Sequence, residues 1–220
     1  MDSNIGTLKV EKVLNGKLLE MCYFAHNNTD NKCICIDPGY ETDKIMRCID
    51  EKGFVVDSIL LTHGHFDHVL TCRALQDRFD AKIYISKIDE NILYSSEHNY
   101  AFLINKTNFD NIKIYKTLED GDVIDILGYK IYCLSTPGHT KGSICYYFKS
   151  ENILFSGDTL FKDTYGRVDL FSGNLEEMKD SLYNKLFKLP DDTKVYPGHG
   201  MMTDIAHEKI YNEINRSDYI

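Results

Sequence analysis

One stretch of six residues carries four side chains of the kind that bind metal ions, and it constrains the fold of this 220-residue chain more than any other feature. His63, His65, Asp67 and His68 directly follow the apolar run Ser58–Leu61 and precede a predicted helix. His63 and His65 are two residues apart, so in an extended chain they point the same way. Three imidazoles and a carboxylate packed together without a cation would be electrostatically costly. The cluster therefore predicts a metal site at a strand end, suited to zinc, iron or manganese.

Two further motifs offer ligands of the same type. Pro-Gly-His occurs at 137–139 and again at 197–199, each time after an apolar strand-like run, and Ser-Gly-Asp occurs at 156–158 after another. Each motif alone is compatible with an ordinary turn. Loops at the edge of a sheet are where sites are usually built. Together with the first cluster, the motifs predict that His139, Asp158 and His199 complete the metal site.

The remaining sequence indicates a chain of many short strands and a few helices. Helical spacing is expected over 42–51 and 69–79, from an N-cap at Asn174 to about residue 187, and from about residue 203. Strands dominate the middle and helices occur in both halves, which favours two sheets faced by helices in one domain over 1–220. Runs rich in Ile, Val, Tyr and Leu predict strands over 7–13, 18–25, 32–36, 58–61, 82–85, 112–115, 123–127, 130–134, 143–148, 153–155 and 194–195.

The order of these motifs resembles the signature of the metallo-β-lactamase fold superfamily, from about residue 5 to 210. Within it, the chain is most similar to the glyoxalase II-like group of short hydrolases. The resemblance implies an α+β fold, an αββα sandwich of two mixed sheets flanked by helices. It also implies two metal sites: a first held by His63, His65 and His139, a second held by Asp67, His68 and His199, with Asp158 bridging both.

The resemblance implies a binuclear metal-dependent hydrolase that cleaves a thioester or ester, as a hydroxyacylglutathione hydrolase does. Two divalent ions about 3.5–4 Å apart can share a hydroxide and lower its pKa towards about 7. Zinc is the first expectation, with iron or manganese as alternatives. Asp67 is assigned to catalysis as well as to the metal. Arg167, Lys141 and Tyr165 are candidate substrate-binding residues, although Arg167 could instead form a turn-stabilising salt link with Asp169.

Several alternatives stay open at this point. A mono-iron persulfide dioxygenase would share the first cluster and a Gly-Arg-x-Asp turn, but Pro-Gly-His-Gly around His199 favours hydrolases. A hydrolase of another ester or a lactone is also compatible. Glyoxalase II enzymes carry an added helical C-terminal region. Their turn after the bridging Asp reads Gly-Lys-Phe-Tyr, whereas residues 166–169 of this chain read Gly-Arg-Val-Asp. These differences weaken the expectation of glutathione specificity. The physiological substrate and the oligomeric state are left open.

Charge and cysteine content set limits on partners and compartment. The net charge is −9, from 25 Lys and Arg against 34 Asp and Glu, which disfavours binding to nucleic acid or an anionic membrane. No run reaches the roughly 18 apolar residues of a membrane span, and Met1–Asn4 lacks a signal-peptide pattern. The seven cysteines form no Cys-x-x-Cys pair and are expected to be buried, reduced thiols. We therefore expect a cytoplasmic protein that acts on a small molecule.

Overall fold

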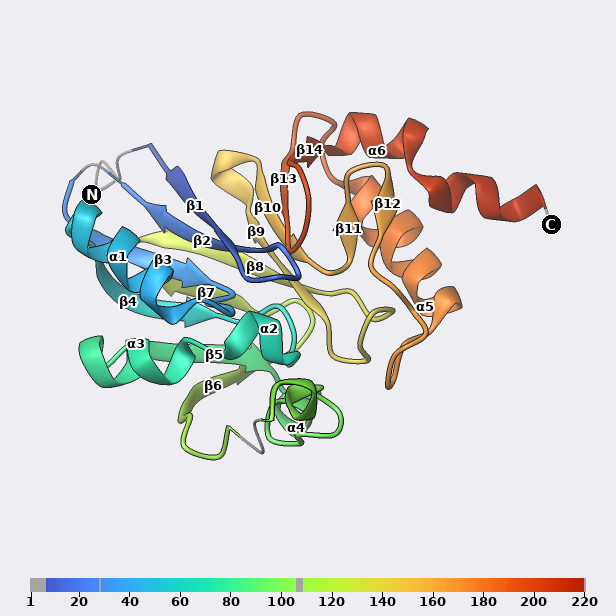
Figure 1. The fold of residues 1–220 in the computed structure, drawn as a ribbon. Coiled ribbons are helices and arrows are strands. Elements are labelled where there is room, and N and C mark those ends of the chain that lie inside the picture. Colours follow the sequence, from blue (N-terminus) through green and yellow to red (C-terminus); the bar gives the residue numbers. More distant parts are fainter. Residues whose placement is uncertain (1–6, 28, 106–108, 220) are drawn as a thin grey trace.

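In the computed structural model, which describes residues 7–27, 29–105 and 109–219, two six-stranded sheets pack face to face (Figure 1). The first sheet is mixed. Its first three strands pair antiparallel, and the third to the sixth run parallel to one another. Its strands, in spatial order, are β1 (Lys9–Asn15), β2 (Glu20–His26), β3 (Lys32–Ile36), β4 (Val55–Leu60), β5 (Lys82–Ser86) and β6 (Ile114–Leu118).

The second sheet is also mixed, because β10 and β13 pair parallel while the other neighbours pair antiparallel. A separate hairpin of β11 (Leu160–Phe161) and β12 (Thr164–Tyr165) stands beside it. Two mixed sheets confirm the predicted αββα architecture. The strands, in spatial order, are β14 (Thr203–Asp204), β13 (Lys194–Pro197), β10 (Ile153–Gly157), β9 (Ile144–Phe148), β8 (Tyr129–Ser135) and β7 (Val123–Ile126).

Alternating side chains build the core between the sheets. In β2, Tyr23 and Ala25 belong to the central cluster, whereas Cys22 and Phe24 belong to the cluster on the outer face. The same alternation divides β9, where Tyr146 faces the centre. Successive side chains of a strand point to opposite faces, so strands buried on both faces read as continuous apolar runs. This is why the sequence marks them so clearly.

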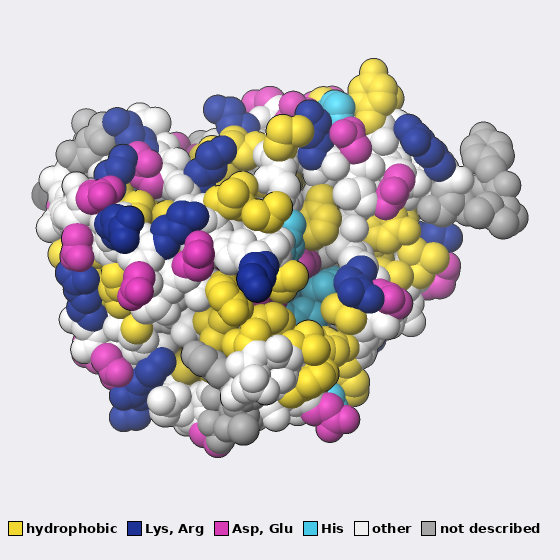
Figure 2. All heavy atoms as spheres, in the orientation of Figure 1, with side chains coloured by type: hydrophobic (Ala, Val, Ile, Leu, Met, Phe, Trp, Pro, Cys, Tyr) yellow, Lys and Arg dark blue, Asp and Glu magenta, His cyan; other side chains and the backbone are white. Residues whose placement is uncertain are grey.

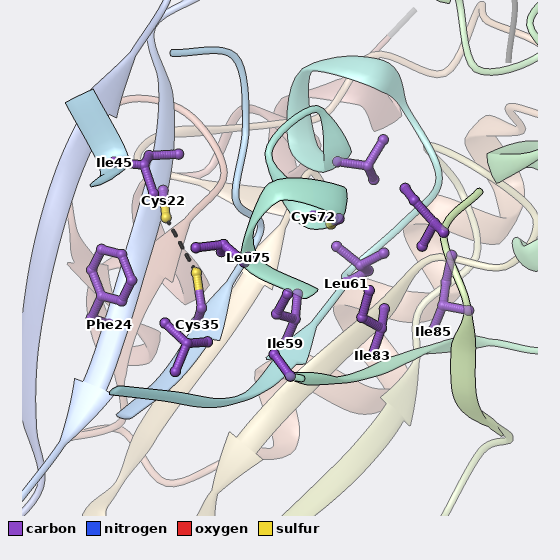
Figure 3. Packing of buried hydrophobic residues seen from close by; sticks show 14 of the residues in the cluster. Cys22, Phe24, Cys35, Ile45, Ile59, Leu61, Cys72, Leu75, Ile83 and Ile85 are labelled. Carbon is purple, nitrogen blue, oxygen red and sulfur yellow. Dashed lines mark hydrogen bonds between the residues drawn. The ribbon is translucent and has the colours of Figure 1, made fainter. Parts of the chain in front are cut away.

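Helices cover the outer face of each sheet (Figure 1). On the first sheet, Ile45 and Leu75 pack against Cys22 and Cys35, and Figure 3 shows this layer. The two sulfur atoms are 3.6 Å apart, far beyond the roughly 2.05 Å of a disulfide. All seven cysteines are free and six are buried, as predicted. The covering helices are α1 (Thr42–Lys52) and α3 (Cys72–Phe79) on the first sheet, and α5 (Leu175–Asp180) and α6 (Ile205–Tyr211) on the second.

The helix expected over 69–79 is wrong in its boundaries. The structure divides it into α2 (Phe66–Val69) and α3, with a break at Thr71. The backbone N–H of Thr71 donates to the carbonyl of Pro38 and its hydroxyl donates to the carbonyl of Gly39. These bonds to the loop after β3 replace a bond within the helix. The break therefore arises from a contact distant in sequence, which helical periodicity cannot reveal.

The C-terminal helices agree better with the sequence. Asn174 caps α5 as predicted, since its side chain accepts a hydrogen bond from the N–H of Glu177. After Asp180 the chain stays helical through a π-helical turn, Ser181–Lys185, and a 3-10 turn, Leu186–Lys188. Within the described ranges, no helix is long and apolar enough to cross a membrane. The last predicted helix begins at Ile205 as α6, and the tail continues as the 3-10 turn η5 (Glu213–Tyr219). Elements that the sequence did not indicate are β11, β12, β14, α4 (Glu90–Leu93) and the 3-10 turns η1 (Ala101–Ile104) and η2 (Lys149–Glu151).

Candidate metal centre

The seven predicted ligands come from four segments that meet at one edge of the two sheets. The first cluster lies in the loop after β4 and in the short helix α2, and each other ligand follows the end of one strand. Six of the seven side chains are buried, and that of His199 is partly exposed. The placements are His63 and His65 after β4, Asp67 and His68 in α2, His139 after β8, Asp158 after β10 and His199 after β13.

The first group consists of His63, His65 and His139. One ring nitrogen of each lies within 4.8 Å of the others. The Nδ1 atom of His65 and the Nε2 atom of His139 are 2.9 Å apart. Two ligands that are each about 2.1 Å from a tetrahedral zinc ion stand about 3.4 Å apart. The spacing of this group is therefore compatible with a single ion at its centre.

The second group consists of Asp67, His68 and His199, again with ligand atoms within 4.8 Å of one another. Asp158 lies between the two groups. Its Oδ2 atom is 3.5 Å from Nε2 of His139 and 3.5 Å from Nε2 of His199, and its Oδ1 atom is 3.5 Å from Nε2 of His68. One carboxylate thus reaches ligands of both groups, which is the arrangement that a bridging ligand requires.

Hydrogen bonding indicates that these residues fit divalent cations. Among the described residues, the buried Nε2 atoms of His63 and His68 and the Oδ1 atom of Asp158 have no hydrogen-bond partner. Buried polar atoms are nearly always satisfied, so inward-facing orphans call for a ligand. Imidazoles and carboxylates suit zinc, iron or manganese.

The outward nitrogen of four of the five imidazoles has a partner outside the cluster. Metal-bound histidines typically have such a partner, which fixes the ring and its tautomer. His65 is the exception: its Nδ1 atom faces His139, and its buried Nε2 atom has no hydrogen-bond partner among the described residues. The Nδ1 partners are Thr62 Oγ1 for His63 at 3.1 Å, Asp37 Oδ2 for His68 at 3.0 Å, the carbonyl of Arg167 for His139 at 2.8 Å and the carbonyl of Leu18 for His199 at 3.0 Å.

Burial and the negative charge of Asp158 together determine the pKa values of the five imidazoles. Burial lowers the pKa of His63, His65 and His139, so these imidazoles are neutral at pH 7. Burial would also lower the pKa of His68 and His199, but neighbouring carboxylates, Asp158 foremost, outweigh it and raise both. Burial alone would raise the pKa of Asp158, yet the imidazoles beside it hold that pKa well below its usual range. Asp158 is therefore an anion, the form that binds a metal.

Two buried carboxylates of the site were missed by the sequence interpretation. Asp37, in the loop after β3, accepts from Nδ1 of His68. Asp89, after β5, accepts from the N–H groups of Gly64 and Gly142 and from the hydroxyl of Thr140. Asp89 thus connects the loop of the first cluster to the loop of the third ligand. Asp-Pro-Gly at 37–39 follows an apolar strand, as the ligand motifs do, and this position could have indicated that Asp37 belongs to the site. The sequence around Asp89 contains no comparable motif.

A cleft of about 550 Å³ opens beside the metal centre. Tyr165 and Arg167 line it, together with five of the seven candidate ligands. Arg167 also forms a two-point ion pair with Asp169, with both N–O distances 2.8 Å, the salt link that the sequence left as an alternative. Lys141 lies outside this lining and pairs with Glu177. Of the three candidate substrate-binding residues, the structure therefore brings two to the cleft.

The β11–β12 hairpin, which forms part of the cleft wall, is held by a buried carboxylate of α6. Glu208 accepts hydrogen bonds from the N–H of Asp163, the hydroxyl of Thr203 and the amide of Asn212. The Nε2 atom of His207, the residue before Glu208, lies 2.5 Å from Oδ1 of Asp163 at the tip of the same hairpin. These contacts fix the hairpin relative to α6 and to β14 of the second sheet, and the ring of Phe161 in the hairpin lies 5.9 Å from that of His199.

Comparison with known proteins agrees with this arrangement. Residues 16–199 match the family model described as the metallo-beta-lactamase superfamily. The chain belongs to the metallo-β-lactamase superfamily. A relative in Bacillus subtilis (strain 168), named as the probable metallo-hydrolase YqgX, is 35% identical over 84% of this chain and 87% of its own length. The hydroxyacylglutathione hydrolase GloC of Haemophilus influenzae is 32% identical over 87% of this chain and 90% of its own.

Solved structures of this superfamily resemble the chain over nearly its whole length. BLEG-1 B3 metallo-beta-lactamase has a TM-score of 0.84 and 29% identity, covering 93% of this chain and 98% of its own. TTHA1623 in a di-iron-bound form has a TM-score of 0.79 and 31% identity, covering 92% and 98%. ETHE1 from Myxococcus xanthus has a TM-score of 0.76 and 28% identity, covering 93% and 83%. These neighbours and the His and Asp groups support a metallo-hydrolase that uses divalent metal.

Proposed function

We propose that this metallo-hydrolase of the metallo-β-lactamase superfamily holds two metal ions and cleaves a thioester or ester. The position of Asp158 carries the proposal, since its carboxylate lies 3.5 Å from ligand atoms of both groups. The Haemophilus influenzae relative named as a hydroxyacylglutathione hydrolase supports the thioester. Zinc is the metal that we propose, and the di-iron form of TTHA1623 makes iron the first alternative.

The chain's own residues would divide the work as follows. Two ions bound here would supply a water of lowered pKa, able to attack a carbonyl at neutral pH. Asp67 lies 3.7 Å from Nε2 of His199 and lines the cleft. Its carboxylate can therefore orient that water by accepting a hydrogen bond from it. Tyr165 and Arg167 lie at the cleft and would position the substrate. Attack forms a carbon–oxygen bond and breaks the carbon–sulfur or carbon–oxygen ester bond, and the leaving group takes the proton.

A persulfide dioxygenase is the second candidate, supported by the likeness to ETHE1. Such an enzyme needs one iron, whereas this chain brings Asp67, His68 and His199 together as a second group. A complete second group favours the hydrolase. A lactone or another ester would use the same residues and is a variant of the proposal rather than a rival to it.

Metal analysis combined with a substrate panel tests the proposal. The purified protein should hold two ions per chain and cleave thioesters without consuming oxygen. One iron per chain, with persulfide-dependent oxygen uptake and no thioester cleavage, would establish the dioxygenase instead. His63→Ala should abolish both metal binding at the first group and turnover, whereas His26→Ala, at the end of β2 away from the centre, should leave both unchanged.

We further propose a cytoplasmic enzyme with a small-molecule substrate. Its seven unpaired cysteines suit a reducing compartment. The net charge of −9 opposes association with nucleic acid or with an anionic membrane surface. Fractionation of cells and the subunit mass in solution would test location and oligomeric state.

A further inference from the structure

The walls of the cleft beside the metal centre are apolar. They come from the β1–β2 turn, from α2, from η1, from the β11–β12 hairpin and from the loop that follows it. Figure 2 shows hydrophobic side chains gathered around the histidine atoms on this face. A largely apolar pocket with a few convergent polar groups is typical of a small-molecule site. The apolar wall residues are Leu18, Phe66, Tyr100, Leu103, Phe161 and Leu170.

The apolar surface continues from the cleft onto its rim. Leu103 is 64% exposed and Leu18 is 54% exposed, although both line the cleft. A second, smaller hollow of about 350 Å³ shares Phe161 with the cleft and extends to Met201, which is 67% exposed. Contiguous exposed apolar surface beside a site marks a ligand-binding groove. The groove is therefore longer than the metal centre alone requires.

The cleft offers little to a negatively charged substrate. Arg167 is the one cation among its described lining residues, and Asp169 occupies two of its donors at 2.8 Å each. The Arg167 guanidinium holds the pKa of Asp169 at about 2, so the pair is ionised throughout the neutral range. Its charge is therefore already compensated. Carboxylates of a peptide such as glutathione would meet no other Lys or Arg among the described residues that line the cleft, and Lys162 lies in the neighbouring hollow.

One wall residue is held in place at a conformational cost. Tyr100 has a φ of +63°, a region that bulky L residues avoid. Its hydroxyl accepts from the N–H of Phe171 at 2.8 Å, and its ring centroid is 5.3 Å from that of His65. Strained residues that the surroundings hold in place are concentrated at binding sites. The wall is thus fixed next to a candidate ligand before any substrate arrives.

We propose that the substrate of this chain carries an apolar acyl chain, which lies along the wall of Leu18, Tyr100 and Leu103 while its carbonyl faces the metal centre. The inference rests on the proposed function and names the substrate class within it. The polar edge of the cleft, from Thr164 to Arg167, is then left for the carbonyl and the leaving group. Acyl groups with long alkyl chains gain contact with the exposed leucines that a short acyl group cannot reach.

A chain-length series on one neutral thiol tests the inference. Acetyl, butanoyl and octanoyl thioesters of N-acetylcysteamine are compared with lactoylglutathione, using the metal-loaded enzyme. Each fully buried methylene can add up to about fourfold, and the open cleft buries the chain only in part. We expect kcat/KM to rise at least tenfold from acetyl to octanoyl, and lactoylglutathione to be cleaved more slowly than octanoyl thioester.

Substitutions in the wall test whether its leucines cause the dependence of kcat/KM on acyl chain length. Leu18→Ser combined with Leu103→Ser should reduce kcat/KM for octanoyl thioester about tenfold and change that for acetyl thioester less than twofold. Both side chains are largely exposed, so folding should not suffer. Ile210→Ser, on the outer surface of α6 and 68% exposed, is the matched control and should change neither. Equal loss for both thioesters in the double variant would contradict the placement of the acyl chain.

A binding measurement separates this inference from the proposed function. The non-hydrolysable thioether S-octyl-N-acetylcysteamine should bind the metal-loaded protein at least tenfold more tightly than the S-methyl thioether, and 0.5 M salt should not weaken it. Preference for lactoylglutathione with no chain-length effect would overturn the inference and leave the hydrolase standing. If a two-metal protein cleaves none of the thioesters, the proposed function fails. In that case, equal binding of the two thioethers would also contradict the inference that the cleft binds an apolar chain.

Discussion

Asp37 lies beneath His68, with its Oδ2 atom 3.0 Å from Nδ1 of the imidazole, and both side chains are buried. Asp37 also accepts from the backbone N–H and the hydroxyl of Thr62 at 2.8 and 2.7 Å. A carboxylate that receives three donors fixes the ring of His68 and leaves its Nε2 atom facing Asp158. The second group of ligands is therefore supported from β3, a strand that contributes no ligand.

Asp37→Asn should weaken metal binding at the second group. The amide presents a donor where the carboxylate accepts, so at least one buried donor loses its partner. We expect a loss of about 1–3 kcal/mol in the free energy of unfolding and of 10–100-fold in affinity for the second ion. Calorimetric metal titration and urea unfolding measure the two effects. Asp57→Asn, on neighbouring β4 and partly exposed, is the control, and equal losses there would remove the special role of Asp37.

Asp158→Ala and Asp67→Ala should both be nearly inactive but should differ in metal content. Asp158 reaches ligands of both groups, so its loss removes the shared carboxylate and leaves two cations facing each other without the intervening negative charge. Occupancy should fall at both sites. Asp67 lies within 4 Å of ring nitrogens of His68 and His199 and belongs to the second group, so the three-histidine group should keep its ion. Two ions per chain in purified Asp158→Ala would show that Asp158 is not the bridge.

Gly138→Ala should move the third ligand. Gly138 precedes His139 and has a φ of +148°, and an added Cβ would lie 2.6 Å from Cα of Met178 in α5. The loop must shift away from α5, so we expect a loss of about 2–4 kcal/mol in unfolding free energy and a fall in metal affinity. Gly121→Ala separates sterics from backbone strain, because φ is +81° there but nothing lies within 4 Å. It should cost about 1–2 kcal/mol and leave metal binding unchanged.

The sequence indicated which candidate ligands the structure brings together better than it indicated the residues that support them. Each ligand motif is local: a few residues at the end of an apolar strand, where a buried polar side chain is conspicuous. The supports are not local. Asp89 joins Gly64, which is 25 residues before it, to Thr140, which is 51 residues after it, and nothing in the sequence around Asp89 indicates this. Tyr100 reaches the cleft through a left-handed conformation that no propensity favours.

The same distinction explains the errors in secondary structure. Strands buried on both faces were found because their apolar runs are continuous. The hairpin of β11 and β12 has two residues in each strand, too few for any alternation. It is held by Glu208 from α6, a contact between segments 45 residues apart. Short elements that are held by side chains distant in the sequence cannot be predicted from local sequence patterns.

Buried thiols should make the protein less stable at alkaline pH. Cys133 lies between the sheets with no exposed surface, and burial raises its pKa to about 12; burial raises that of Cys145 to about 11. In the unfolded chain a thiol ionises near pH 8.5. Above that pH the folded state holds protons that the unfolded state has lost. Stability is therefore fully present below about pH 8.5 and falls as pH rises towards the folded pKa, by about 1.4 kcal/mol per pH unit for each such thiol.

Urea unfolding at pH 7.5, 9.0 and 10.0 checks this, with Cys133→Ala as the diagnostic variant. The variant lacks one titrating thiol, so its disadvantage relative to the parent should shrink by about 1.4 kcal/mol per unit between pH 9 and 10. Cys48→Ala is the matched control, because Cys48 is only partly buried. Its stability difference should change less with pH. Parallel pH curves for the parent and Cys133→Ala would show that the Cys133 thiol already ionises in the folded protein, contrary to its place between the two sheets.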